Sequence, residues 1–234
     1  RAKLAEQGAD LLPLTKLDEV AWLFNLRGSD IAYNPVFTAY ALLDGQRAWL
    51  FTRSGRLDAT AQEALAQAQV ECRPYEEFFG ALSVLAKGKA VLFSPSAHSY
   101  ATAQALRALG GDVRWVEAPS PVALLKSVKN PAELAGMRRA NLQASRAVLR
   151  TLAWLDAQAE RGAALTEYQL ADQVERHYAE EPGFVGLSFN TIAGSAAASS
   201  VVHYGTPDAL RPIGLGEWVL LDSGAQYRGS DPDA

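Results

Sequence analysis

Ala90-Val91-Leu92-Phe93 and Val113-Arg114-Trp115-Val116 are short apolar runs, and residues 100–109 between them carry a helical pattern that ends at Gly110-Gly111. A continuous apolar run bounded by turn signals is typical of a strand buried in a sheet. Strands that alternate with helices along the chain indicate a sheet covered by helices. This stretch therefore predicts an α/β fold for the first half of the chain.

The same alternation extends toward the N-terminus. Leu11-Leu12-Pro13-Leu14 is strand-like, and residues 39–43 and 48–51 flank Asp44-Gly45. Because Asp-Gly between two apolar runs is typical of a β-hairpin turn, these two runs are predicted to pair antiparallel. The sheet is therefore expected to be mixed rather than wholly parallel. Helical patterns cover three further segments, at residues 17–24, 57–67 and 78–85.

A change of pattern follows Ala118-Pro119-Ser120-Pro121. Two prolines in this short segment favour a linker or a domain edge, which divides the chain into predicted domains at residues 1–121 and 122–234. Asn130-Pro131-Ala132-Glu133 then combines a capping residue, a proline at the first helical position and a reciprocal glutamate, so a long helix is predicted to begin here. Its apolar face is predicted from residues at helical spacing: Leu134, Met137, Ala140, Ala144, Val148, Leu152 and Leu155.

A second capping box, Thr166-Glu167-Tyr168-Gln169, predicts the start of a second helix. Short β-like runs follow at residues 187–192, 201–204 and 218–221. The second half of the chain is therefore predicted to be α+β, with two helices followed by β-structure.

The composition excludes several classes of protein. Of 234 residues, 49% are hydrophobic and 21% are charged, as in globular proteins. The net charge of −4 and the absence of a basic stripe argue against nucleic acid as a partner. No apolar run approaches the roughly 18–20 residues that a membrane span needs. A single cysteine fits a reducing compartment, so a cytoplasmic location is expected. Because the chain begins without methionine and stops abruptly, we expect a longer parent protein.

Several common chemistries find no support in the sequence. The serines among residues 194–200 lack the G-x-S-x-G pattern of a nucleophile, and the Rossmann, P-loop and H-E-x-x-H motifs are absent. Cys72 stands in an apparent strand and is expected to be a buried structural thiol. His98 and His177 are interpreted as structural histidines. Three acidic residues are interpreted as solvated surface charges, namely Glu180, Glu181 and Asp208.

A pair of aspartates offers a metal site. Trp218-Val219-Leu220-Leu221 predicts a buried strand that ends at Asp222, where a carboxylate must be paired, hydrogen-bonded or bound to a cation. Asp233 follows eleven positions later, and a hairpin of this length can place both carboxylates on one face. Such a pair suits a hard divalent cation such as Mn²⁺. The alternative is that Asp222 caps a turn and Asp233 lies in a solvated tail.

His203 has two interpretations from the residues alone. It follows Val201-Val202 and precedes Tyr204, so it is either a hydrogen-bonded histidine at a strand end or a catalytic group.

An ordered set of segments resembles the cytosolic, three-domain Xaa-Pro aminopeptidases (aminopeptidase P) of the pita-bread metallopeptidase family. Residues 17–31 (LDEVAWLFNLRGSDI) and 33–37 (YNPVF) are similar to the middle domain of that family. The segments that resemble its catalytic domain follow in the family's order: 129–134 (KNPAEL), 186–192 (GLSFNTI), 202–204 (VHY) and 221–227 (LDSGAQY). The sequence departs from the family pattern at residues 196–200 and around Asp233.

The resemblance implies a creatinase-N-terminal-like mixed sheet with helices, followed by part of a pita-bread domain, in a homodimer. It implies two divalent metal ions, most often Mn²⁺ with Zn²⁺ or Co²⁺ as alternatives, and peptides with proline in second position as substrates. By position, Asp222 and Asp233 match the first two metal-ligand aspartates. His203 matches the histidine that lines the substrate site and contacts the scissile peptide group.

The family completes its site with one histidine and two glutamates downstream of both aspartates. These positions lie beyond residue 234, so the chain alone is expected to bind Mn²⁺ weakly and to be inactive. Two metal ions that share a water can generate a nucleophile and clamp the oxyanion, and a neutral His203 can donate to that oxyanion. Two alternatives stay open, another pita-bread hydrolase of the prolidase or creatinase type and a non-catalytic pita-bread binding module.

Overall fold

The computed structural model describes residues 1–228 and divides the chain into two compact units, the second of which begins at Lys129. The predicted domain division after residue 121 lies seven residues before this point. Asp233, the predicted second metal ligand, lies outside the described residues.

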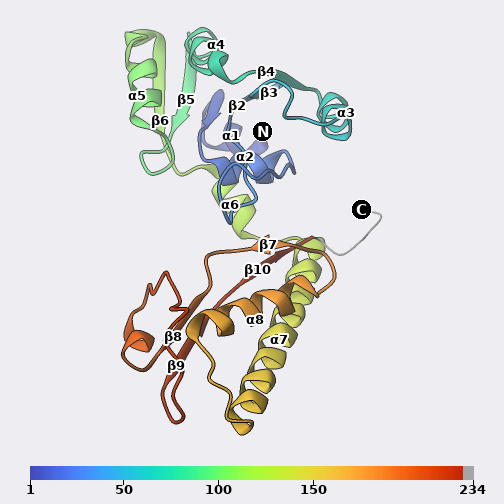
Figure 1. The fold of residues 1–234 in the computed structure, drawn as a ribbon. Helices are drawn as coiled ribbons and strands as arrows, with labels where there is room; N and C mark the ends of the chain where they lie inside the picture. Colours follow the sequence, from blue (N-terminus) through green and yellow to red (C-terminus); the bar gives the residue numbers. More distant parts are fainter. Residues whose placement is uncertain (229–234) are drawn as a thin grey trace. The chain divides into compact units, whose positions relative to one another are not determined.

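The first unit is built on a six-stranded sheet with strand order β4-β3-β2-β1-β5-β6 (Figure 1). Its strands are β1 (Leu11–Leu14), β2 (Ala39–Asp44), β3 (Ala48–Thr52), β4 (Val70–Pro74), β5 (Lys89–Phe93) and β6 (Val113–Glu117). The β1–β2 and β2–β3 pairs are antiparallel, whereas β3–β4, β1–β5 and β5–β6 are parallel. The predicted mixed sheet is confirmed, and β2 and β3 form the expected hairpin at Asp44-Gly45.

Apolar side chains cover both faces of this sheet because successive residues of a strand point to opposite sides. On β1, Leu12 and Leu14 join one core cluster and Leu11 joins the other. Around them pack the helices α1 (Ala2–Glu6), α2 (Leu17–Leu23), α3 (Ala59–Gln67), α4 (Phe78–Leu85), α5 (Tyr100–Arg107) and α6 (Pro121–Ser127), with short 3-10 turns η1 (Tyr75–Glu77) and η2 (Gly110–Asp112).

The segment predicted as a linker or a domain edge leads into α6, where Pro121 begins the helix, Val122 lies in the core, and the Ser120 hydroxyl donates to the buried Glu19 carboxylate at 2.5 Å. One local prediction in the first unit is wrong. Cys72 is exposed rather than buried, because β4 is an edge strand of the sheet.

The second unit combines two helices with two short antiparallel ribbons (Figure 1). In chain order it contains α7 (Pro131–Glu160), α8 (Glu167–Ala179), β7 (Phe184–Leu187), β8 (Ile192–Ser195), the 3-10 turn η3 (Ala196–Ser200), β9 (Val219–Asp222) and β10 (Ala225–Tyr227). β7 pairs with β10, and β8 pairs with β9. Both predicted capping boxes are present at the helix starts, and the α+β arrangement is confirmed.

The packed face of α7 differs in part from the predicted one. Ala144 and Val148 pack against α8 as expected, but the fully buried positions are Ala147 and Thr151. Leu134 and Met137 are exposed. Within residues 1–228 no helix is both long enough and apolar enough to cross a membrane. The longest, α7, has 30 residues but carries charged side chains along its length.

His98 joins the segment after β5 to strand β1 in the first unit. Its Nε2 lies 2.7 Å from the carbonyl oxygen of Pro13 on β1, and its Nδ1 accepts a hydrogen bond from the Ser94 amide at 2.9 Å. Neutral imidazole satisfies both contacts, with the proton on Nε2, whereas a proton on Nδ1 would face the Ser94 N–H. Burial lowers the pKa of His98. The predicted structural role of His98 therefore has a defined geometry.

We expect His98→Asn to destabilise the first unit by about 1–3 kcal/mol at pH 7.5, because two buried backbone groups lose their partner. Since the pKa of His98 is lowered in the folded state, the unfolded chain takes up the extra proton below pH ~6.5. The stabilisation is complete above that pH and falls as the pH drops through it. Urea unfolding of wild type and variant between pH 5 and 7.5 checks this. An equal pH slope in both proteins would contradict the assignment.

Candidate functional site

Asp222 is the last residue of β9 and is exposed at its end. The premise that it ends a buried strand is wrong, because residues 219–221 are only half-buried and Trp218 is 85% exposed. β9 belongs to a two-stranded ribbon, of which Val219 and Leu221 pack on the helical side. Among residues 1–228 the Asp222 carboxylate makes no hydrogen bond or ion pair, so it is available to a ligand.

The turn after Asp222 is tightly held. The Ser223 hydroxyl lies 2.9 Å from the hydroxyl of Tyr178, which is 1% exposed on α8. The Gly224 carbonyl accepts a hydrogen bond from the Ser188 amide at 2.9 Å. A Cβ atom on Gly224 would overlap the Ser188 hydroxyl and lie 3.0 Å from the Phe189 ring. These contacts fix the direction in which the chain leaves Asp222.

His203 is exposed in a turn between η3 and β9. The predicted β-structure over residues 201–204 is therefore wrong, and its apolar residues Val201 and Val202 are exposed as well. The neighbours of His203 are nevertheless anchored. The Tyr204 hydroxyl donates to Glu167 at 2.8 Å, and the Asn190 side-chain amide donates to the Gly205 carbonyl at 2.6 Å.

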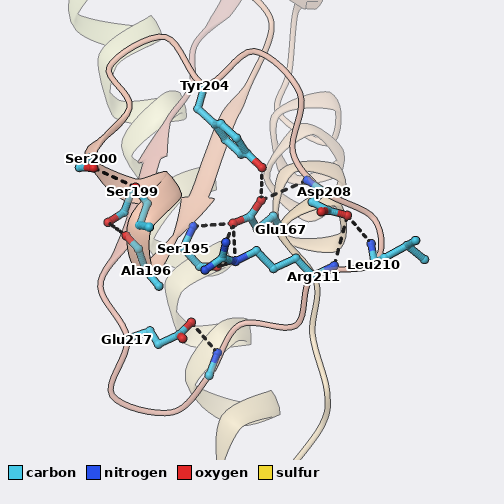
Figure 2. Close-up of polar contacts among 12 residues, drawn as sticks. Glu167, Ser195, Ala196, Ser199, Ser200, Tyr204, Asp208, Leu210, Arg211 and Glu217 are labelled. Atoms are coloured by element: carbon cyan, nitrogen blue, oxygen red, sulfur yellow. Dashed lines mark hydrogen bonds and ion pairs between the residues drawn. The ribbon is translucent and has the colours of Figure 1, made fainter.

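Glu167, at the first position of α8, is fully buried and holds this part of the chain together (Figure 2). Its Oε1 accepts from the Ser195 amide at 2.7 Å and from the Ser195 hydroxyl at 2.8 Å, and Arg211 Nε lies at 3.5 Å. Its Oε2 accepts from the Tyr204 hydroxyl and from the Asp208 amide at 3.1 Å. The carboxylate therefore joins α8 to β8 and to the segment that returns from η3 to β9.

Burial of Glu167 would raise its pKa, but the hydrogen bonds from the Ser195 and Asp208 amides and from the Tyr204 and Ser195 hydroxyls outweigh that effect and hold the pKa below its usual value. The role of Glu167 was not predicted from the sequence. This residue stands inside the capping box, where an acidic residue in the first turn of a helix needs no tertiary partner to explain it.

The three acidic residues that were predicted to be solvated surface charges differ in exposure and in partners. Glu181 is 8% exposed and pairs with Arg146 at 2.6 Å, so its assignment as a solvated charge is wrong. Glu180 is exposed and pairs with Arg150. Asp208 is exposed, and its carboxylate caps the Leu210 amide at 2.7 Å. His177 is buried against Thr151, with Nδ1 at 2.8 Å from the hydroxyl, as expected for a structural histidine.

Asp222 and the ring of Tyr204, the residue after His203, both adjoin the β8–β9 ribbon. Asp222 stands opposite Ile192, and Leu220 stands opposite Gly194. Because side chains repeat every two residues and directly opposed residues share a face, the Asp222 side chain and the Cβ direction of Gly194 lie on the same face. The Tyr204 ring approaches Gly194 so closely that a Cβ there would lie 3.2 Å from it.

Of the two predicted metal ligands, only Asp222 lies among the described residues. Residues 1–228 contain no group of three or more histidine, cysteine, aspartate or glutamate side chains that could enclose an ion. An exposed carboxylate without a protein partner, such as that of Asp222, fits a hard divalent ion as one ligand. The chemistry of the donor therefore suits the metal that the resemblance implies, and further ligands must come from residues other than these.

Comparison with known proteins places the chain in a family. Residues 1–133 match the model of the creatinase/prolidase N-terminal domain, and residues 135–231 match metallopeptidase family M24. The chain belongs to the creatinase/prolidase family. A probable Xaa-Pro aminopeptidase P of Pyricularia oryzae is 40% identical over 225 residues, which is 92% of this chain and 36% of the relative. A probable Xaa-Pro aminopeptidase P of Metarhizium robertsii is 38% identical over 100% of this chain and 40% of its own length.

Solved structures agree with this membership of the creatinase/prolidase family. The X-prolyl aminopeptidase of Caenorhabditis elegans, a cytosolic enzyme with a di-nuclear active site, has a TM-score of 0.84 at 29% identity over 97% of this chain and 37% of its own. A dipeptidase of Mycobacterium ulcerans has a TM-score of 0.72 at 22% identity over 97% of this chain and 58% of its own, and shows the fold alone. The chain spans between about a third and two fifths of the curated relatives given above.

In this member of the creatinase/prolidase family we expect Gly224→Ala to lower the free energy of unfolding by about 1–3 kcal/mol, because a methyl group must displace Ser188 or Phe189. Gly186→Ala on β7 is the matched control, since a Cβ there meets nothing within 4 Å. Chemical unfolding of both variants measures the difference. If the Gly224→Ala and Gly186→Ala variants were equally stable, the turn after Asp222 would accommodate a methyl group without strain.

Proposed function

We propose that the protein containing this chain is a metal-dependent aminopeptidase that releases the N-terminal residue from peptides with proline in second position. The observation that carries the proposal is that Asp222 is exposed and has no side-chain partner among residues 1–228, in a second unit whose anchored loop presents His203. The chain is 38–40% identical to probable Xaa-Pro aminopeptidases P. An exposed carboxylate at a rigid strand end and an exposed imidazole on a held turn suit a ligand-binding centre.

The proposed roles follow from the chemistry of each group. Asp222 and Asp233 hold two divalent ions, with Mn²⁺ preferred and Zn²⁺ or Co²⁺ as alternatives. Bound in pairs, such ions activate water and stabilise the charge that develops on the scissile group. Asp222 adds a negative charge that attracts the ammonium group of the peptide N-terminus. Neutral His203 donates a hydrogen bond to the carbonyl oxygen of the bond before proline, where negative charge grows during attack.

The finer assignments belong to the same proposal. We propose that the protein works in the cytoplasm as a homodimer, on short peptides rather than on nucleic acid or at a membrane, and that the domain division falls at 1–121 and 122–234. The cytosolic location of the Caenorhabditis elegans X-prolyl aminopeptidase supports the compartment, and its di-nuclear active site supports two ions.

The test uses the full-length gene product, freed of metal by chelation and reloaded with Mn²⁺, Zn²⁺ or Co²⁺. We expect cleavage of an Ala-Pro-Ala tripeptide, little cleavage of Ala-Ala-Ala, and a loss of at least about 100-fold in Asp222→Asn because a charged ligand is gone. Asp156→Asn, at an exposed position on α7, is the matched control and should keep wild-type activity.

Each alternative gives a different result in that assay. Cleavage restricted to the dipeptide Ala-Pro would indicate a prolidase-type enzyme. A protein that takes up none of the three metals and cleaves none of these substrates would be a non-catalytic module, and this result would overturn the proposal.

We expect the 234-residue chain alone to bind Mn²⁺ weakly and to hydrolyse no Xaa-Pro peptide. The reason is that residues 1–228 offer no cluster of three metal-binding side chains, and two ions need more ligands than Asp222 and Asp233 supply. Calorimetric titration with Mn²⁺ and a peptide assay on the purified chain check both points. Turnover by this polypeptide would refute the expectation.

A further inference from the structure

We propose that Glu167 is a positioning residue, whose buried carboxylate fixes the loop over residues 195–211 and thereby the place of His203 relative to the β8–β9 ribbon. The inference rests on the proposed function, since it gives Glu167 a role in that reaction through His203. Glu167 itself is fully buried, and its role is therefore exerted through the residues that it binds.

The contacts of Glu167 close this loop at both ends (Figure 2). Ser195 at the end of β8 donates to Oε1 through its amide and its hydroxyl, while Arg211 lies 3.5 Å from the same oxygen and donates to the Ser195 hydroxyl at 3.1 Å. The two ends of a loop of seventeen residues are thus pinned on one oxygen of a rigid helix start.

The other oxygen of Glu167 holds the middle of the loop. Oε2 accepts from the Tyr204 hydroxyl at 2.8 Å and from the Asp208 amide at 3.1 Å, so it grips the residue directly after His203 and a second point four residues further on. Asn190 holds Gly205 from another direction. His203 is therefore exposed, yet its neighbours on the C-terminal side are fixed from two sides.

The same carboxylate also acts on the strand that faces Asp222. Ser195 pairs with Val219, and three residues earlier on β8 Ile192 pairs with Asp222. Because a β-ladder fixes register along its whole length, the position of Ser195 sets that of the β8–β9 pair. Glu167 is therefore connected to both predicted site residues. It reaches Asp222 through Ser195 and the β8–β9 pair, and it reaches His203 through Tyr204.

Neutral replacements cannot reproduce these contacts. A glutamine at position 167 has one acceptor oxygen. Its NH2 group would face the donors that now bind the second carboxylate oxygen, so donors would oppose donors. Either Ser195 or the pair Tyr204 and Asp208 would lose its acceptor in a site without water access. Tyr204→Phe is the milder change, because it removes one bond and leaves the other donors in place.

The first measurement is amide hydrogen exchange in the full-length gene product, because it needs no activity. We expect Tyr204→Phe to raise exchange about tenfold in peptides covering residues 201–211, and Glu167→Gln to raise it further and to include the Ser195 amide. Exchange in the first unit should stay as in wild type. Tyr168→Phe, an exposed tyrosine on the same helix, is the matched control.

The second measurement separates positioning from a general structural role. With the Ala-Pro-Ala peptide, we expect Tyr204→Phe to lower kcat about tenfold with KM within about twofold, because an interaction made in the transition state is misaligned. In a His203→Ala background, Tyr204→Phe should have no further effect on kcat, since it acts through His203. Metal content should equal that of wild type in all variants that keep Asp222.

The outcomes separate this inference from the proposed function. Unchanged exchange in both variants overturns it. Raised exchange also overturns it if Tyr204→Phe lowers kcat as much in the His203→Ala background as in wild type, because the Tyr204–Glu167 contact then acts on the reaction without His203. A wild-type protein that cleaves no Xaa-Pro peptide rejects the proposed function, and with it the role in that reaction, whereas the exchange data still decide whether Glu167 holds the loop.

Discussion

The second unit depends on one buried charge. A carboxylate in the interior is costly unless each of its oxygens is filled by donors, and Glu167 meets this condition with two amides, two hydroxyls and a guanidinium. In return, a single side chain defines where α8, β8 and the loop over residues 195–211 meet. Few apolar contacts could do this, because the loop exposes its large apolar residues, such as Val202 and Leu210. Hydrogen bonds of defined direction replace a packed core at this place.

Asp222 and Glu167 are carboxylates in opposite environments. Glu167 is buried and saturated with donors, so it stabilises the fold. Asp222 is exposed and has no side-chain partner among residues 1–228, so its oxygens are available to a ligand. The apolar run before Asp222 predicts the opposite environment, because such a run before an aspartate is typical of a buried strand. The run lies instead in a two-stranded ribbon, so only alternate residues reach the helical side. A free carboxylate at a rigid turn is nevertheless what a hard cation requires.

Local features of the fold were predictable from the sequence and tertiary ones were not. The capping boxes at Asn130 and Thr166 involve neighbours three residues apart, so the residues alone identify both helix starts. The mixed sheet followed from strand–helix alternation and one hairpin signal. In contrast, the role of Glu167 depends on donors 28 to 44 positions away, and the turn at His203 depends on those same contacts. The residue pattern raised Asp222 and His203 as candidates and the family resemblance gave them roles, but neither carried information about what holds them.

The contributions of the buried histidines and of Glu167 to stability depend on pH in two separate ranges. His98 in the first unit and His177 between α7 and α8 are held as neutral groups, and burial lowers the pKa of each. Their contributions to stability are complete above pH ~6.5 and weaken below it. The pKa of Glu167 is lowered as well, but a carboxylate is stabilising in its charged form, so its contribution persists until the pH falls through its folded-state pKa, below the ordinary value of 4.5. Between these two ranges the contributions of His98 and His177 decline, while the Glu167 carboxylate keeps its charge and its donors. Within the second unit, the contact of His177 therefore weakens at a higher pH than the contacts that hold the loop over residues 195–211.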